Sequence, residues 1–209
     1  MSTLDAATRQ GHRRVIDVAA LPTDAFGNQG LVWWGTVGFM VIEGSMFVMG
    51  IVVYFYLRLK VHQWPPSLRD PSIGIATANL LLVLVSCLPN QFVKSAAERY
   101  DAAGARRWLA VLTAIGVVTL ILRGFEYTQL NCSWSDNAYA SITWLLLSMH
   151  SIHVATDVVD GAVLLALITA QPVTNRRFVD LSENSDYWYF IVAWWIPIYL
   201  IIYLAPRWL

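Results

Sequence analysis

The chain has 209 residues, of which 57% are hydrophobic and ten are Trp, and its formal net charge is zero. A composition this apolar is typical of a membrane protein with several spans and excludes an ordinary soluble domain. With no net positive charge and no cluster of Lys and Arg, we expect no nucleic acid as a partner.

Five apolar runs follow one another, each long enough to cross a hydrocarbon core of ~30 Å as a helix of about 20 residues. They occupy residues 31–57, 72–94, 107–127, 138–170 and 186–205. The sequence therefore predicts an all-α integral membrane bundle of five transmembrane helices within residues 31–209. Residues 1–30 are polar and mixed in charge and are expected to form an N-terminal arm. Residues 171–185, between the fourth and fifth spans, are expected to form a polar loop.

Basic residues are distributed unequally over the two sides of this arrangement. The side that holds the N-terminal arm carries nine Lys and Arg residues, whereas the opposite side carries four. Since cytoplasmic segments near membrane spans are enriched in Lys and Arg, we expect the N-terminus of this multi-pass protein to lie in the cytoplasm.

The fourth span carries a stripe of ionisable residues. Its members recur three, four and three residues apart: His150, His153, Asp157 and Asp160. At ~100° per residue, this spacing places all four within roughly 80° of the helix circumference. Because ionisable groups are costly in lipid, the stripe is expected to face protein or a water-filled cavity.

Glu43 lies inside the first span, about 18 Å along a helix from Leu31, and His150 lies about 18 Å from the far end of the fourth span. Because the two spans run in opposite directions, both residues are expected near the middle of the bilayer. We therefore predict that Glu43 and His150 contact each other. Two interpretations of Glu43 stay open: a proton-relay carboxyl group, or a hydrogen-bonded residue that fixes helix register.

His150 and His153 have the spacing of two metal ligands on one helix face, with Asp157 as a candidate third ligand. The chain has only four histidines, and His12 and His62 lie outside the spans. That is too few ligands for a membrane di-metal site, so satisfied polar packing is the favoured interpretation. We expect no metal, no cofactor and no catalytic residue in this chain.

Two further pairs of residues have two interpretations each. Asp157 and Asp160 lie toward the cytoplasmic end of their span, where they form either an entrance for protons or a solvated helix end. Arg123 and Glu126 are three residues apart near the end of the third span. They form a local ion pair, or Arg123 binds a lipid phosphate.

Four motifs occur in the order seen in one membrane protein family. The first span, WWGTVGFMVIEGSMFVMGIVVYFY, resembles a helix of subunit three of the haem–copper terminal oxidases, the cytochrome c oxidase subunit III family, with Glu43 as the matching buried carboxyl group. The other three are the turn Trp64–Pro66, FEYTQ at Phe125–Gln129 and MHSIHV at Met149–Val154. The resemblance extends over 31–209 and is closest to the five-span bacterial forms.

The resemblance implies a subunit without redox centres, in the inner membrane of a bacterium. It would lie beside the catalytic subunit one, which holds the haems and copper, with subunit two and other oxidase subunits, in a complex that reduces oxygen to water and pumps protons. In that family the subunit holds phospholipids in a cleft, supports proton uptake and stabilises the catalytic subunit during turnover. Asp157 and Asp160 depart from the family's pattern, as do Tyr189 and Val192, where the last helix often carries His and Asp.

Three other functions stay open from the sequence. A related accessory protein of nitric oxide reductases has the same pattern. A small membrane transporter is the second alternative, although inverted repeats and helices broken at mid-depth are not evident. An independent membrane metalloenzyme is the third, and the small number of ligands argues against it. The chain itself is expected to be a non-catalytic part of an oxidoreductase and translocase complex.

Overall fold

The computed structural model describes residues 25–66 and 70–208, so most of the expected N-terminal arm, residues 1–24, lies outside the described residues. Within them the chain is helical and contains no strand. The long helices are α1 (Leu31–Arg58), α2 (Ile73–Glu98), α3 (Ala102–Thr128), α4 (Ala138–Ala170) and α5 (Asn175–Tyr199). A short helix, η3 (Gly27–Gln29), precedes α1, and α5 continues through η4 (Leu200–Leu204) and α6 (Ala205–Trp208).

All five long helices have the length and hydropathy needed to cross a membrane, with the last one counted from Asn175 to Trp208. The predicted all-α bundle of five transmembrane helices is therefore confirmed. The predicted polar loop at 171–185 is wrong, because α5 already begins at Asn175. The first half of α5 is polar, so hydropathy alone does not identify it as part of a span. Helix α5 is stabilised by packing against α2 and α4.

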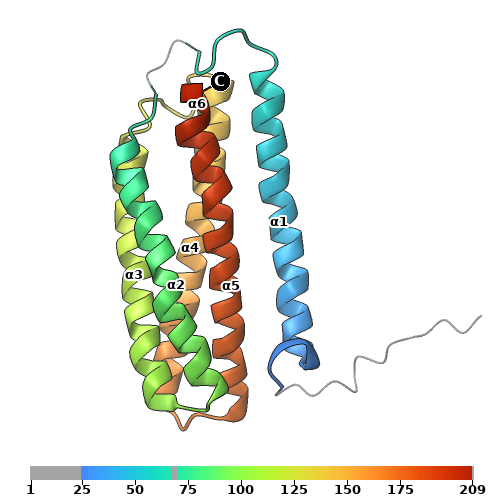
Figure 1. Ribbon diagram of the computed structural model, residues 1–209, viewed down its shortest axis with the longest axis vertical. Coiled ribbons are helices and arrows are strands. Elements are labelled where there is room, and N and C mark those ends of the chain that lie inside the picture. The colour runs from blue at the N-terminus through green and yellow to red at the C-terminus, as the bar shows by residue number, and fades with distance from the viewer. Residues whose placement is uncertain (1–24, 67–69, 209) are drawn as a thin grey trace, which may run out of the picture.

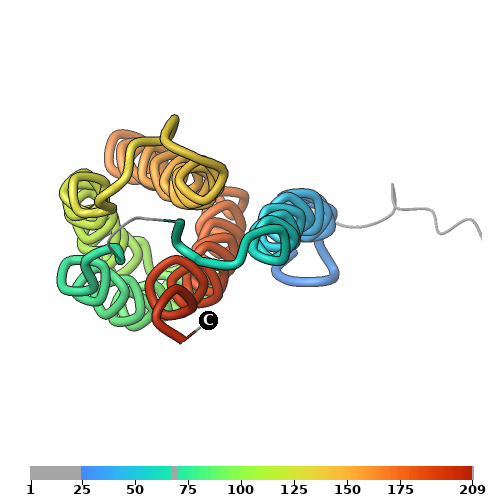
Figure 2. Tube along the Cα trace, turned by 90° about the horizontal axis from the view of Figure 1, so that it is seen from above, coloured from blue at the N-terminus to red at the C-terminus, as the bar shows by residue number. Residues whose placement is uncertain are grey.

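Helices α2–α5 form a compact group, and α1 lies at its side against α4 and α5 (Figures 1 and 2). The chain crosses from α1 to α2 over one end of this group (Figure 1). At that end two hydrogen bonds attach α1 to the group. Trp64 Nε1 donates to the hydroxyl of Tyr54 on α1 at 2.8 Å, and this hydroxyl donates to the Ile201 carbonyl at 3.0 Å. Toward its other end α1 stands away from the group, and a cleft lies there.

Local sequence explains where the helices begin and how the last one changes. The Asp101 carboxylate caps α3 by accepting from the backbone N–H groups of Ala103 and Gly104, and the Asn137 side chain caps α4 in the same way. Pro197 lies inside α5 and has no N–H to donate. The wider turns of η4 follow it directly, and they place Tyr203 in the core of the bundle.

Close packing of α3 against α4 depends on Gly116. A Cβ atom added at Gly116 would lie 2.4 Å from Cγ2 of Val158, whereas a Cβ added at Gly124 of the same helix meets no atom within 4 Å. Small residues let helix backbones approach closely inside membranes, where van der Waals packing holds helices together. Gly116 is therefore a position at which side-chain volume controls the distance between two helices.

We predict that Gly116→Ala destabilises the protein by about 1–3 kcal/mol, because the added methyl group overpacks the α3–α4 contact. Gly124→Ala is the matched control, and it should leave stability unchanged or raise it slightly, since Ala is the better helix former. Thermal unfolding in mild detergent measures both variants. Equal melting temperatures for the two variants would contradict this account of the packing.

Candidate functional site

The ionisable stripe of α4 is divided between two environments. His153, Asp157 and Asp160 line a cleft between α1, α4 and α5, whereas His150 faces the interior of the α2–α5 group and is fully buried. The sequence placed all four residues on one face of the helix. The face spans about 80°, so His150 at one edge contacts the interior of the bundle while the other three residues face the cleft.

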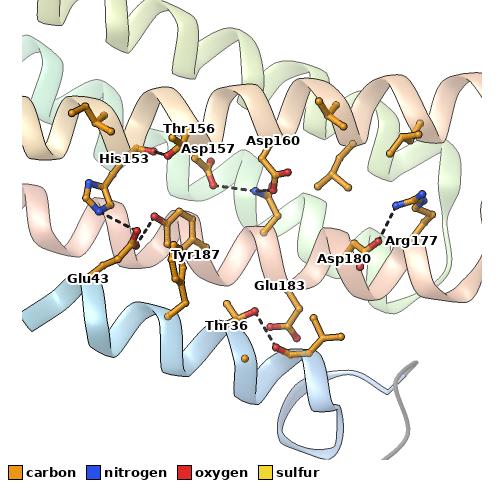
Figure 3. A pocket seen from close by; sticks show the side chains of 18 residues that line it. Thr36, Glu43, His153, Thr156, Asp157, Asp160, Arg177, Asp180, Glu183 and Tyr187 are labelled. Carbon is orange, nitrogen blue, oxygen red and sulfur yellow. Dashed lines mark hydrogen bonds and ion pairs between the residues drawn. The ribbon is translucent and has the colours of Figure 1, made fainter.

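The cleft has a volume of about 900 Å³ (Figure 3). It is bounded by the first half of α1, the second half of α4 and the first half of α5, so it opens at the end of the bundle where α1 begins. The polar residues that line it are Thr36, Glu43, His153, Thr156, Asp157, Asp160, Arg177, Asp180, Glu183, Asn184 and Tyr187.

Glu43 closes the cleft at its inner end and binds residues of two other helices. Its Oε1 lies 3.3 Å from Nε2 of His153 on α4, and the Tyr187 hydroxyl of α5 donates to its Oε2 at 2.6 Å (Figure 3). The predicted contact between Glu43 and His150 is therefore wrong. The prediction estimated the depth of each residue along its helix and did not fix the rotation of the helix. His150 and His153 lie about 60° apart around the axis of α4, and of the two only His153 faces α1.

The hydrogen bonds of His153 indicate which of its nitrogen atoms faces Glu43. Its Nδ1 lies 2.6 Å from the Met149 carbonyl oxygen, which only accepts, so Nδ1 carries a hydrogen. Nε2 then faces the Glu43 carboxyl group at 3.3 Å. Two lone pairs would repel each other there, so the contact requires one proton, on the imidazole or on the carboxyl group. Glu43 and His153 thus form a hydrogen-bonded pair that joins α1 to α4.

Asp157 and Asp160 share one amide from α5. Nδ2 of Asn184 lies 3.0 Å from Oδ1 of Asp157 and 3.4 Å from Oδ2 of Asp160 (Figure 3). The Asp157 side chain is 5% exposed, whereas Asp160 is exposed at the cleft. The two carboxyl groups therefore continue the polar wall from the level of His153 toward the open end of the cleft.

Sequence reasoning missed most of the residues of α5 that line the cleft because it placed residues 171–185 in a loop. A signal was present in the spacing. Asp180, Glu183 and Tyr187 are three and four residues apart, which is the helical spacing that revealed the stripe on α4. The same test applied to residues 175–187 would have found a second polar stripe facing the first.

A second polar cluster is buried between α2, α3, α4 and α5. Nη1 of Arg123 binds Oε2 of Glu126 at 2.8 Å, and the two side chains are 2% and 1% exposed. The local ion pair considered from the sequence is thus present, and both residues lie inside the bundle. Asn79 donates to Glu126 Oε2 at 3.2 Å, and the Tyr203 hydroxyl donates to its Oε1.

Arg123 also orients His150. Its Nη2 lies 3.1 Å from Nδ1 of His150, and its guanidinium carbon stands 3.7 Å from the centre of the Trp195 ring. A guanidinium only donates, so Nδ1 accepts and Nε2 carries the hydrogen that is donated to the Ile191 carbonyl at 3.1 Å. His150 is therefore a neutral imidazole that joins α3 to α5, and it is separate from the cleft.

These groups offer hydrogen bonding, proton exchange and attraction of cations. Among the residues that the structure describes, no group of three or more His, Cys, Asp or Glu side chains could hold a metal ion. The donor set of the cleft is dominated by carboxyl groups from three different helices. Such a set suits a hydrated or cationic occupant better than an anionic one.

Comparison with known proteins adds the family. The family model described as "Cytochrome c oxidase subunit III" matches residues 20–207. A cytochrome c oxidase subunit 3 from Thermostichus vulcanus is 24% identical over 177 residues, which cover 83% of this chain and 87% of the relative. A probable cytochrome c oxidase subunit 3 from Mycobacterium leprae is 28% identical over 173 residues, covering 81% and 85%. A cytochrome c oxidase subunit 3 from Synechocystis is 25% identical over 191 residues, which cover 88% of this chain and 81% of the relative.

We predict that Arg123→Leu destabilises the protein by about 3–5 kcal/mol, because it leaves the Glu126 carboxyl group and one nitrogen of His150 buried without a charged donor. Arg107→Leu is the matched control on the same helix. Arg107 is exposed, and its hydrogen bond within the described residues is to the Ala103 carbonyl one turn away, so its loss should change stability little. Unfolding in mild detergent measures both variants, and similar losses for the two would refute the structural role assigned to Arg123.

Proposed function

The chain belongs to the cytochrome c oxidase subunit III family, and from that membership we propose its place in the cell and its task. It is the accessory subunit III of a haem–copper respiratory oxidase. We place it in the inner membrane of a bacterium with its N-terminus in the cytoplasm, beside the catalytic subunit that carries the haems and copper. The match over residues 20–207 is the observation that carries the assignment to subunit III, and the excess of Lys and Arg on the side of the N-terminal arm supports the proposed orientation.

The alternatives find no support in these relatives. All three are named as subunits of cytochrome c oxidase, whereas the alternatives were an accessory protein of a nitric oxide reductase, a small transporter and an independent metalloenzyme. The oxidase as a whole reduces oxygen to water and couples this reaction to proton pumping. The haem and copper that perform it belong to partner subunits, and this chain contributes to the complex without performing the chemistry.

We infer that the contribution of the chain lies in the cleft. On the proposed orientation, the cleft opens at the cytoplasmic side, where the oxidase takes up protons. The carboxyl groups near the open end of the cleft exchange protons close to that surface, and the pair formed by Glu43 and His153 lies deeper, at the inner end of the cleft. Together these groups support proton uptake. Its apolar walls hold phospholipid beside the complex, and the bundle as a whole stabilises the catalytic subunit during turnover.

Isolation of the tagged chain from its native membrane in mild detergent tests this proposal. We predict that it co-purifies with subunits that show haem absorption and copper, and that the isolated complex consumes oxygen with a reduced electron donor. The matched control is the same purification from cells that express the chain without the tag. A chain recovered alone, with no haem absorption in the eluate, would overturn the assignment to an oxidase.

A further inference from the structure

A small cavity lies inside the bundle between α3, α4 and α5. Its lining includes the hydroxyl-bearing Thr113 of α3, and it shares Asp157 of α4 and Asn184 of α5 with the cleft. The space open to the centre of a water molecule is about 10 Å³. One buried water molecule needs roughly 10–15 Å³ measured in this way, and it needs polar groups to bind. The cavity therefore has about the size of one water molecule.

The hydroxyl group of Thr113 points to an occupant of this cavity. Its oxygen is buried and has no hydrogen-bond partner among the described residues. The hydroxyls of Thr36 and Thr169 instead donate to backbone carbonyl groups one turn earlier in their helices. A Cβ atom added at Gly161 would lie 3.1 Å from Thr113 Oγ1, so the hydroxyl faces a part of α4 that carries no side chain. A buried polar group without a partner is costly, so Thr113 is suited to bind a molecule that enters the cavity.

Asp157 offers further hydrogen-bonding capacity to the same cavity. Its side chain is 5% exposed, and within the described part of the chain its side-chain hydrogen bond is the one from Asn184, at 3.0 Å. A carboxylate has about four acceptor positions, and a protonated carboxyl group can also donate. The indole N–H of Trp188, which also lines the cavity, is already used, because it donates to Ser86 at 2.8 Å. Thr113 and Asp157 are therefore the groups with capacity left for an occupant.

We propose that the cavity binds one water molecule, held by the Thr113 hydroxyl and the Asp157 carboxyl group. Water both donates and accepts, so it can satisfy a hydroxyl and a carboxyl group together. A cation would meet a single carboxyl group in this cavity, and an apolar molecule would leave the hydroxyl without a partner. The water joins α3 to α4 and continues the polar contacts of the cleft into the bundle, because Asp157 lines both spaces. This inference goes beyond the proposed function and does not depend on it.

A cryo-electron microscopy map of the purified protein, with the subunits that accompany it, tests the site directly. At a resolution that reveals ordered water, we expect one density peak within about 3 Å of Thr113 Oγ1 and of a carboxyl oxygen of Asp157. Thr113→Val keeps the shape of the side chain and removes the hydroxyl, so the peak should be absent from a map of this variant. A cavity without density in the unmodified protein, or a peak that persists in Thr113→Val, would overturn the proposal.

The sign of a change in stability tests the site independently of a map. If water is bound, Thr113→Val loses it and leaves Asp157 with fewer partners. The melting temperature should then fall by about 2–4 °C, as for the loss of one hydrogen bond. If the cavity holds no water, the same substitution removes an unsatisfied polar group, and the melting temperature should stay the same or rise. An unchanged or higher melting temperature would therefore overturn the proposal.

Thr119→Val is the matched control on the same helix. The Thr119 hydroxyl is also buried without a hydrogen-bond partner among the described residues, but Thr119 does not line the cavity. Its replacement should leave the melting temperature unchanged or raise it, so a fall equal to that of Thr113→Val would contradict the assignment to the cavity. Thr113→Ser keeps the hydroxyl and should keep the density peak, and loss of the peak in this variant would also count against the site. All of these results leave the oxidase assignment intact, because that assignment is tested by the haem content of the purified complex.

Discussion

The contact of Glu43 with His153 and Tyr187 is the interaction on which the cleft depends. Helix α1 is attached to the bundle at one end by the hydrogen bonds of Trp64 and Tyr54, and near its middle by this contact. Between that point and its N-terminal end, α1 stands away from α4 and α5. Polar groups placed inside a membrane must find partners there, so the contact fixes both the rotation of α1 and the inner limit of the cleft.

The two polar clusters of the molecule serve different ends. Arg123 and Glu126 are enclosed by four helices and joined to neutral donors and to His150, so their charges are matched inside the bundle. The carboxyl groups of the cleft have few basic partners and face an open space. In the same membrane environment, the first arrangement holds helices together, and the second presents carboxyl groups to an open space that attracts positive charge.

Sequence predicted the fold and one half of the cleft. Apolar runs reveal spans because the bilayer requires them, and the period of the helix placed His153, Asp157 and Asp160 together. The partner of Glu43 was misassigned because distance along each helix gives the depth of a residue in the membrane but leaves the rotation of the helix about its axis undetermined. The half of the cleft contributed by α5 was missed because residues such as Glu183 are polar, and hydropathy alone assigns polar segments to loops. Those residues belong to a helix that packs against α2 and α4.

A double-mutant cycle between Glu43 and His153 tests the central claim most directly. Glu43→Gln, His153→Gln and the double variant are compared by their free energies of unfolding in the purified complex, beside a parallel cycle with His150→Gln. The account predicts a coupling energy of about 0.5–3 kcal/mol between Glu43 and His153, as for residues in contact, and none between Glu43 and His150. Coupling of Glu43 to His150, or to neither histidine, would contradict it.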